Sequence, residues 1–267
     1  MPALGATWRA LRVTEHLLTG IVIALAIAPL PRVGIARPWL PDLVSWWHRR
    51  LCRCLSLRIE THGLRRAPAL LVSNHVSWID IPALAALGPV TFLSKVEVRD
   101  WPVIGWLSVL SGTLFLKRGA HQTGAMTQQI AACLQAGQCV TVFPEGTTSD
   151  GTTLLRFHSR LFAVAQQSTL TLQPVAIRYG RNGKPDPVAP FIGDDSLLPH
   201  LWRVLRRPGM RVEISFLPPV ASAVRDRRAL AEACRTAIAQ RLGLHDEPEL
   251  ELDTAGELVP GRAAAGR

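Results

Sequence analysis

Residues 69–84 read ALLVSNHVSWIDIPAL, a cluster of polar side chains between two apolar runs. Within this cluster His75 and Asp80 stand five positions apart. Polar, titratable groups between buried segments are costly unless they are partnered. An aspartate paired with a histidine also lets the imidazole remove a proton from a hydroxyl. We therefore interpret His75 and Asp80 as a catalytic pair.

The spacing of this pair indicates where a helix must start. Residues five apart on one ideal helix point about 140° away from each other and would not meet. Ser77-x-x-Asp80 resembles a capping box, which predicts that Ser77 caps a helix and that Asp80 lies in its first turn. His75 then lies in the turn before the helix, where Nδ1–H reaches the Asp80 carboxylate and Nε2 faces the substrate. Asn74 is expected to hold this turn by side-chain hydrogen bonds.

Beyond residue 56, short β-branched runs alternate with helical patterns, which is typical of an α/β domain. We predict a mostly parallel central sheet of about seven strands over residues 57–61, 68–73, 90–94, 113–117, 138–143, 171–178 and 211–217. The predicted flanking helices cover residues 77–87, 101–110, 121–136, 157–167 and 224–242. The domain is expected to span 57–245, with a surface loop at 181–190. Residues 246–267 are acidic and then rich in Pro, Gly and Ala, which predicts a disordered tail.

Residues 1–56 form a different kind of segment, rich in apolar residues, tryptophan and arginine. The run 17–30 is uncharged and 14 residues long, shorter than the roughly 20 that span a bilayer upright. It can be a membrane-embedded or interfacial anchor helix, a secretory signal peptide or a core helix. The next segment, 39–53, mixes Trp and Leu with Arg, as in a helix lying among lipid headgroups. This favours the anchor, and Glu15 before the run tells against a signal peptide.

The charge balance indicates an anionic partner. The 267 residues carry 30 Lys and Arg against 20 Asp and Glu, a net charge of +10. Such a chain suits an acidic membrane surface, a phosphorylated substrate or nucleic acid. The eight tryptophans favour a membrane interface. Because the chain has only one Tyr and few Phe to stack on bases, we expect no nucleic-acid partner.

The cysteines predict reduced thiols in a cytoplasmic compartment. Their number is odd, no C-x-x-C occurs, and most lie in apolar patterns: Cys52, Cys54, Cys133, Cys139 and Cys234. This excludes a disulfide framework and a zinc site of the usual spacing. No metal site is expected elsewhere in the chain.

The catalytic pair needs a hydroxyl to act on. Ser73 and Ser77 are near it in sequence, so a serine hydrolase or thioesterase is one alternative. The nucleophile-elbow pattern G-x-S-x-G does not occur in the chain. The other alternative is a hydroxyl that belongs to the substrate.

Asn74-His75-(four residues)-Asp80 resembles the N-H-x4-D motif of the glycerolipid acyltransferases. Three further blocks follow in that family's order: 112–118 (GTLFLKR), 143–147 (FPEGT) and 172–177 (LQPVAI). Together they cover roughly residues 60–220. The chain is similar in particular to the bacterial 1-acyl-glycerol-3-phosphate, or lysophosphatidic acid, acyltransferases. Those enzymes also carry an N-terminal membrane-associating helical element, in agreement with residues 13–54 here.

The resemblance implies transfer of a fatty acyl group from acyl-CoA or acyl-carrier protein to a lysolipid hydroxyl. The first expected acceptor is 1-acyl-glycerol-3-phosphate, which gives phosphatidic acid. Arg118 is expected to hold its phosphate, beside Gly146 and Thr147. Glu145 is expected to accept a hydrogen bond from the acceptor or to orient Arg118. Backbone N–H groups near Gly146 are expected to stabilise the thioester oxygen. Pro174 is expected to support the site from a sheet edge or the end of a strand ladder.

Two departures from the family pattern concern the acceptor. Thr148 stands where an Arg is frequent in the family. Arg156, His158 or Arg160 are expected to replace the missing charge, and Lys95 is another candidate cation. An acceptor without a phosphate, such as a lyso-ornithine lipid, would tolerate the loss.

The sequence thus predicts an enzyme bound to the cytoplasmic face of the inner (plasma) membrane. Its expected partners are the lipid bilayer, a lysolipid acceptor and the acyl donor, with no further cofactor. The alternatives are acylation of lyso-ornithine lipid or another lysophospholipid, and a serine hydrolase. A non-catalytic membrane-binding module is a third alternative, but it leaves the four ordered blocks unexplained.

Overall fold

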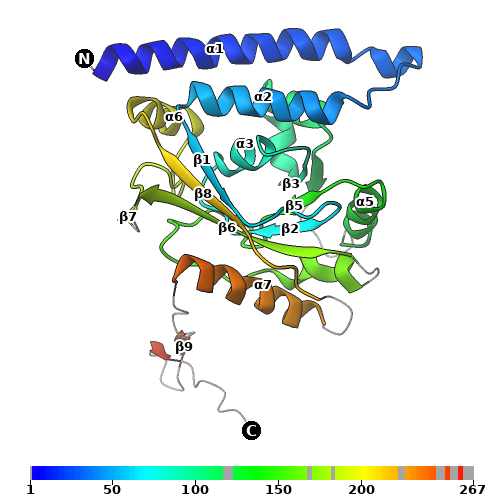
Figure 1. Cartoon of the computed structure of the whole chain (residues 1–267), viewed down its shortest axis with the longest axis vertical. Helices are drawn as coiled ribbons and strands as arrows, with labels where there is room; N and C mark the ends of the chain where they lie inside the picture. Colours follow the sequence, from blue (N-terminus) through cyan, green and yellow to red (C-terminus); the bar gives the residue numbers. More distant parts are fainter. Residues whose placement is uncertain are drawn as a thin grey trace.

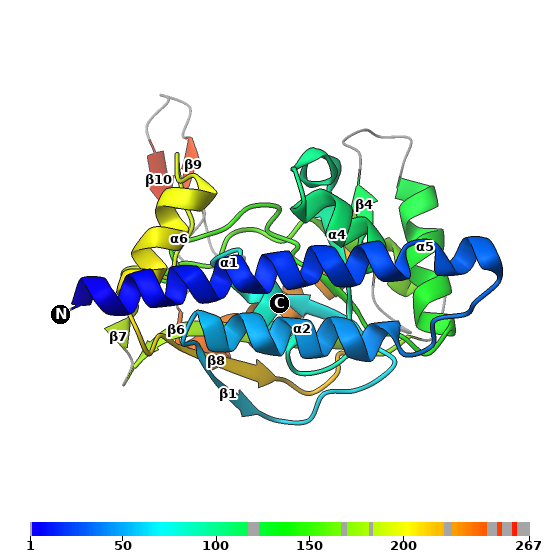
Figure 2. The ribbon, with the colours of Figure 1, turned by 90° about the horizontal axis from the view of Figure 1, so that it is seen from above.

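The computed structural model describes residues 2–116, 123–166, 170–181, 184–221, 226–244, 250–252 and 258–260. Two helices, α1 (Pro2–Ile27) and α2 (Leu40–Cys54), lie side by side along one side of the molecule (Figures 1 and 2). A short 3₁₀ helix, η1 (Leu30–Val33), lies between them. Helix α1 starts well before the predicted apolar run because Pro2 suits the first helical position and the next proline is Pro29.

Residues Leu4–Ile27 of α1 are long and apolar enough to cross a membrane, by length and composition. The exposed apolar side chains of this helix recur every three, four or seven residues and so share one face. We call this the outer face of α1: Leu4, Trp8, Leu11, Leu18, Val22 and Leu25.

The central sheet contains all seven predicted strands and one short addition. Its strands are β1 (Arg58–His62), β2 (Leu70–Ser73), β3 (Thr91–Lys95), β4 (Leu114–Leu116), β5 (Val140–Val142), β6 (Leu172–Arg181), β7 (Lys184–Pro185) and β8 (Arg211–Phe216). The order is β1-β8-β6-β2-β5-β3-β4, with β7 paired to β6. Strands β2 to β6 pair in parallel with their neighbours in that group, whereas β8 is antiparallel to β6. The carboxyl ends of β2 and β5 therefore lie at one edge, where ligands bind in parallel sheets.

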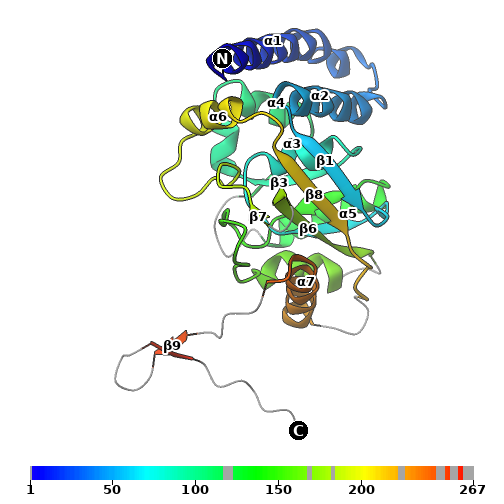
Figure 3. The same ribbon diagram turned by 60° about the vertical axis from the view of Figure 1, so that its left-hand side comes forward.

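Helices cover both faces of the sheet, so two hydrophobic layers form. They are α3 (Asp80–Ala85), η2 (Val96–Asp100), α4 (Ile104–Leu110), α5 (Thr123–Gln135), η4 (Ser159–Gln166), α6 (Leu197–Arg206) and α7 (Arg227–Leu242). Alternation along β2 sends Leu71 into the layer with α2 and α3, and Leu70 and Val72 into the layer with α5 and α7. Figure 3 shows α7 on the side of the sheet away from α1 and α2.

Several predicted elements need correction. The helix predicted over 157–167 is the 3₁₀ helix η4. Helix α6 was not predicted; Pro199 lies in its first turn, where a proline does not break a helix. The predicted loop at 181–190 contains β7, and the described part of the tail contains two short paired strands, β9 (Leu250–Leu252) and β10 (Leu258–Pro260).

Pro174 lies inside the central strand β6, not on a sheet edge. Regular pairing of β6 with β8 starts one residue later, at Val175 and Phe216. Pro174 has no N–H to donate, and its carbonyl accepts a hydrogen bond from Leu217 N just beyond β8. The predicted position at the end of a ladder is therefore confirmed, and the predicted edge position is wrong.

Candidate active site

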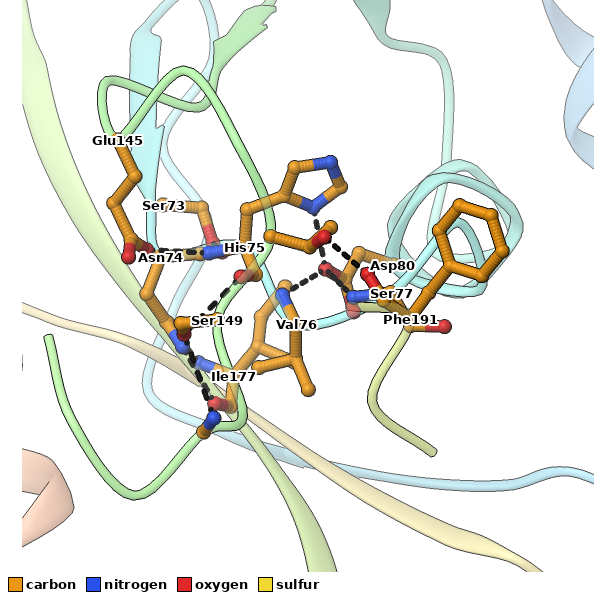
Figure 4. A network of polar contacts seen from close by, with 12 residues as sticks. Ser73, Asn74, His75, Val76, Ser77, Asp80, Glu145, Ser149, Ile177 and Phe191 are labelled. Atoms are coloured by element: carbon orange, nitrogen blue, oxygen red, sulfur yellow. Dashed lines mark hydrogen bonds and ion pairs between the residues drawn. The ribbon is translucent and has the colours of Figure 1, made fainter. Parts of the chain in front are cut away.

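The structure brings His75 and Asp80 together at the carboxyl end of β2 (Figure 4). His75 Nδ1 lies 2.7 Å from Asp80 Oδ2. His75 is in the turn after β2 and Asp80 opens α3, so the ring folds back over the turn as predicted. Of the two side chains, Asp80 is fully buried, whereas His75 is 18% exposed. His75 Nε2 has no hydrogen-bond partner among the described residues, which leaves it available to a substrate.

Asp80 accepts hydrogen bonds from four donors. Besides His75, Oδ2 accepts from the backbone N–H groups of Val76 at 2.8 Å and Ser77 at 3.0 Å. Oδ1 accepts from the Tyr179 hydroxyl at 2.6 Å. Burial and the neighbouring carboxylate of Asp80 raise the pKa of Tyr179 well above its ordinary value, so the phenol stays a donor. Tyr179, from the neighbouring strand β6, was not predicted, because no local sequence pattern links it to a residue 99 positions earlier in the chain.

Ser77 does not cap α3 as predicted. The helix has Ile79 at its N-cap with no side-chain hydrogen bond, and the Ser77 hydroxyl is buried without a partner. The Asp80 N–H, which a Ser77 cap would accept, donates instead to the Ser77 carbonyl at 3.0 Å, and Ser77 N donates to the Asp80 carboxylate, so Ser77 supports the site through its backbone. Ser73 donates its hydroxyl to the carbonyl of Asn74. Neither serine bonds to His75, which tells against a serine nucleophile activated by this pair.

Asn74 holds the catalytic turn against β6. Its amide nitrogen donates to the carbonyl of Ile177 at 2.9 Å, and its amide oxygen accepts from Ile177 N at 2.7 Å. The predicted side-chain bonds are thus present, but they reach a strand distant in sequence and extend the β2–β6 pairing. On the other side, the His75 ring stacks on Phe143, with ring centroids 4.0 Å apart and planes 17° apart. The imidazole is therefore fixed by stacking as well as by Asp80.

Glu145 holds the backbone of the catalytic turn. It is buried, with Oε1 accepting from His75 N at 2.7 Å and Oε2 accepting from Leu155 N at 3.1 Å. Burial raises the pKa of Glu145 to about 7. Glu145 does not line the cavity described below. Its carboxylate therefore joins two backbone segments, and its predicted contact with the acceptor stays a prediction.

Residues 146–149 form a turn directly beside the catalytic histidine. Ser149 N donates to the carbonyl of His75 at 2.8 Å. Gly146 has φ +71°, and a Cβ there would come within 3.1 Å of the His158 ring. The Gly146 N–H already donates to Phe143 O. The N–H groups of Thr147 and Thr148 have no acceptor in the described part of the chain, so they are the donors this turn offers.

The Thr148 hydroxyl holds the segment around Phe191 beside the catalytic turn. It donates to the carbonyl of Phe191, whose own N–H donates to Val76 O at 3.0 Å. Next to it, Trp78 Nε1 lies 3.0 Å from Nδ1 of the buried His200 of α6. The loop before α6 is thereby tied to the catalytic turn.

A cavity of about 1480 Å³ runs past His75. One part is walled by apolar side chains of α1, α2 and α4, among them Val13, Leu17, Ile23, Leu43, Trp47 and Leu107. The cavity is also lined by His75, Phe143, Gly146, Thr147 and Thr148, and by several basic side chains. An apolar channel that leads to a base suits a substrate with a long hydrocarbon chain.

Four of the five side chains predicted to carry the charge of the acceptor site line this cavity: Lys95, Arg156, His158 and Arg160. Lys95 ends β3, and Arg156 lies in the loop before η4. Arg118 falls outside the described residues. Among the residues that the structure describes, no three His, Cys, Asp or Glu side chains come close enough to hold a metal ion.

Known proteins are similar to this chain in sequence, and one solved structure is similar to it in fold. A family model described as Acyltransferase matches residues 57–178. The lyso-ornithine lipid O-acyltransferase of Pseudomonas aeruginosa is 48% identical over 75% of this chain and 78% of its own length. The 1-acyl-sn-glycerol-3-phosphate acyltransferase of Neisseria gonorrhoeae is 33% identical over 63% of this chain and 67% of its own length.

The crystal structure of PlsC, the 1-acyl-sn-glycerophosphate (LPA) acyltransferase of Thermotoga maritima, has the same fold. It aligns with a TM-score of 0.57 at 20% identity, covering 87% of this chain and 97% of PlsC. The chain therefore has the mixed α/β fold of PlsC, with a mostly parallel sheet flanked by helices. The chain belongs to the acyltransferase family, and the protein is an acyltransferase.

Proposed function

We propose that this enzyme transfers a fatty acyl group from an acyl thioester to the free hydroxyl of a lysolipid, with His75 as the general base. The observation that carries the proposal is the 2.7 Å contact between His75 Nδ1 and the buried Asp80 carboxylate. That contact sets the tautomer with the proton on Nδ1, so Nε2 is the free base on the cavity side. The apolar walls of the same cavity fit the hydrocarbon chains of both substrates.

The chemistry balances without a protein nucleophile. His75 Nε2 takes the proton of the acceptor hydroxyl as its oxygen attacks the thioester carbonyl carbon. A C–O bond forms and the C–S bond breaks, and His75 returns the proton to the departing thiolate. Asp80 stabilises the imidazolium that exists between these events. The exchange of a thioester for an ester moves no electrons to an acceptor, so we propose no cofactor beyond the donor.

The negative charge that builds on the thioester oxygen needs hydrogen-bond donors. The N–H of Gly146 is engaged by Phe143 O, so it does not serve this purpose. We assign the role to the N–H groups of Thr147 and Thr148, which line the cavity next to His75. The positive φ of Gly146 turns the chain at this point and lets the substrate approach the following amides.

The acceptor we propose is a lyso-ornithine lipid, in place of the lysophosphatidic acid expected first from the sequence. The relative that carries this name is 48% identical, whereas the lysophosphatidic acid relative from Neisseria gonorrhoeae is 33% identical. Thr148 supports the choice, because its neutral hydroxyl binds Phe191 where the resemblance places a phosphate-binding arginine. Acyl transfer to a lipid fits a site at the cytoplasmic membrane surface, with α1 in contact with the bilayer.

The test is an acceptor panel given to the purified full-length protein in detergent micelles. Equal amounts of lyso-ornithine lipid, lysophosphatidic acid and a lysophospholipid are supplied with one acyl donor, and products are identified by mass. We expect the acylated ornithine lipid to predominate. Exclusive formation of phosphatidic acid would refute the acceptor, and release of free fatty acid alone would refute the transfer reaction.

A further inference from the structure

The cavity is lined by basic side chains as well as by the apolar side chains of α1, α2 and α4. Four basic side chains line it from three separate segments: Lys95, Arg156, Arg160 and Arg228. We call these four residues the basic rim. Glu232 is the only acidic residue among the described residues that line the cavity. The rim is therefore a site of net positive charge at the edge of a concave surface, which attracts and holds anions.

The described residues leave the basic rim without ion pairs, although Arg228 interacts electrostatically with the carboxylate of Asp226. All four side chains are exposed, and none has an ion-pair partner among the described residues. Other arginines of this chain are paired: Arg50 with Glu15, Arg203 with Asp195 and Arg241 with Glu213. Glu232 lies 3.7 Å from Arg235, which is not part of the rim. Unpaired guanidinium groups are well suited to bind phosphate oxygens with two parallel hydrogen bonds.

The basic rim is connected to the catalytic turn through short structural links. Arg156 follows Leu155, whose N–H donates to Glu145, and Glu145 also accepts from His75 N. Two residues further on, the His158 ring packs against Gly146. An extended ligand can therefore reach from the rim to His75 along one cavity wall.

We propose that the basic rim binds the phosphate of the donor's phosphopantetheine arm. This inference rests on the proposed function, because it takes the acyl group to arrive as a thioester. The pantetheine arm carries the thioester at one end and a phosphate at the other, in coenzyme A and in acyl-carrier protein alike. The thioester then lies at His75 with its phosphate at the rim, and the lipid acceptor enters from the apolar part under α1 and α2. The two substrates thus use different parts of one cavity.

The first test compares donors that differ only in the phosphate, S-acyl-pantetheine and S-acyl-4′-phosphopantetheine. The variants are the double substitution Arg156→Gln/Arg160→Gln and the single substitution Arg228→Gln. Arg227→Gln is the matched control, since Arg227 precedes Arg228 on α7 but does not line the cavity. We expect each rim variant to raise the KM of the phosphorylated donor about tenfold, the value of a charged hydrogen bond. The KM of S-acyl-pantetheine and of the lysolipid should stay unchanged, as should all three constants in Arg227→Gln.

An increase in the KM of the lysolipid alone would assign the basic rim to the acceptor and overturn the inference, as would equal effects on both donors. Titration of the enzyme with 4′-phosphopantetheine and with pantetheine, without any acceptor, measures whether the basic rim binds the phosphate independently of acyl transfer. If the phosphate strengthens binding and no acyl transfer occurs, the proposed function fails and the rim assignment stands. Parallel assays with acyl-CoA and acyl-carrier protein then identify which carrier supplies the phosphate.

Discussion

Asp80 is a buried carboxylate whose negative charge is compensated by four hydrogen-bond donors. Removing any one donor leaves part of a buried charge unsatisfied, which is costly in a medium of low polarity. Tyr179 is the donor that can be changed without touching the catalytic turn itself. Substitution of Tyr179 therefore tests how strongly the activity of His75 depends on the orientation of Asp80.

Tyr179→Phe should slow acyl transfer and destabilise the fold together. The loss of a hydrogen bond to a buried charge costs about 1.5–3 kcal/mol of unfolding free energy. Misplacement of the base that Asp80 orients should lower kcat by about 10- to 100-fold, with little change in KM. Steady-state kinetics and denaturant unfolding in detergent measure the two effects.

Thr141→Val is the matched control for this prediction. Thr141 is also buried in the sheet, in β5, but its hydroxyl has no hydrogen-bond partner. Its replacement by the isosteric valine should leave both stability and kcat nearly unchanged. Equal loss of kcat in the two variants would mean that Tyr179 acts through general packing and not through Asp80.

Glu145 should make the stability of the enzyme depend on pH. Its pKa rises from an ordinary 4.5 to about 7 in the folded protein. Between these values the unfolded chain has lost the proton while the folded protein keeps it. Stability from this group is therefore fully present below pH 4.5 and is lost as pH rises through 7, by up to about 1.4 kcal/mol per pH unit.

Glu145→Gln removes this titration, because the amide is neutral at every pH. The wild-type protein should lose unfolding free energy relative to the variant as the pH is raised from 4.5 to 7, and the difference should level off above that range. Thermal unfolding of both proteins in one set of buffers measures this. A difference that is constant across the range would show that Glu145 is ionised throughout.

At the level of residues, the sequence predicts the contacts that are close in the chain and misses those that are distant. His75 and Asp80 are five residues apart, and the turn before α3 brings them together, as the local spacing predicts. Tyr179 bonds to Asp80 across 99 residues, and Asn74 bonds to Ile177 across 103. Such contacts depend on the order of strands in the sheet, which no local pattern contains. Ser77 was assigned as a cap because its spacing to Asp80 fits, but the Asp80 N–H donates to the Ser77 carbonyl and not to its hydroxyl.

Among the elements, α1 carries the membrane interaction in this account. Its outer face exposes Leu18, Val22 and Leu25, with more than half of each side chain accessible. The double substitution Leu18→Lys/Val22→Lys should release the protein from lipid vesicles, since each charge placed in hydrocarbon costs about 2.5–3.5 kcal/mol. Flotation with vesicles and fractionation of cells measure the release.

Leu64→Lys serves as the control, because Leu64 is 77% exposed but belongs to the segment after β1 and not to α1. This variant should stay with the vesicles as the wild-type protein does. If the Leu18→Lys/Val22→Lys protein also stays bound, α1 is not the element that holds the enzyme on the bilayer.

The strands were predicted better than the helices, for a physical reason. Short β-branched runs between turns are distinctive, and all seven were found in the structure. Helical periodicity persists in segments too short or too constrained for a regular α-helix, as in η4. Conversely, no helix was predicted at α6, because Pro199 is unusual inside a helix. The structure has a helix there, which buries His200, Val204 and Leu205. The antiparallel β8 inside the sheet also lies beyond local patterns, because pairing direction depends on the connection.

In the whole molecule, apolar and basic surfaces occupy different regions. Tryptophans more than a third exposed lie on α1 and on segments in or next to helices that contact it: Trp8, Trp39, Trp46, Trp101, Trp106 and Trp202. Tryptophan favours the boundary between hydrocarbon and water. The basic rim lines the same cavity from β3, η4 with the loop before it, and α7. In the proposed reaction the apolar part of the cavity receives the lipid acceptor, and the basic rim receives the phosphate of the donor.

If His75 is the base for acyl transfer to a lysolipid, its removal must abolish most of the activity, and the kcat/KM of His75→Ala measures this directly. His62→Ala is the control, because His62 is a solvent-exposed histidine of β1 that does not line the cavity. With lyso-ornithine lipid as acceptor, the account predicts a loss of about 10²- to 10⁴-fold in a folded His75→Ala enzyme and no loss in His62→Ala. A folded His75→Ala enzyme that transfers acyl groups at the wild-type rate would contradict it.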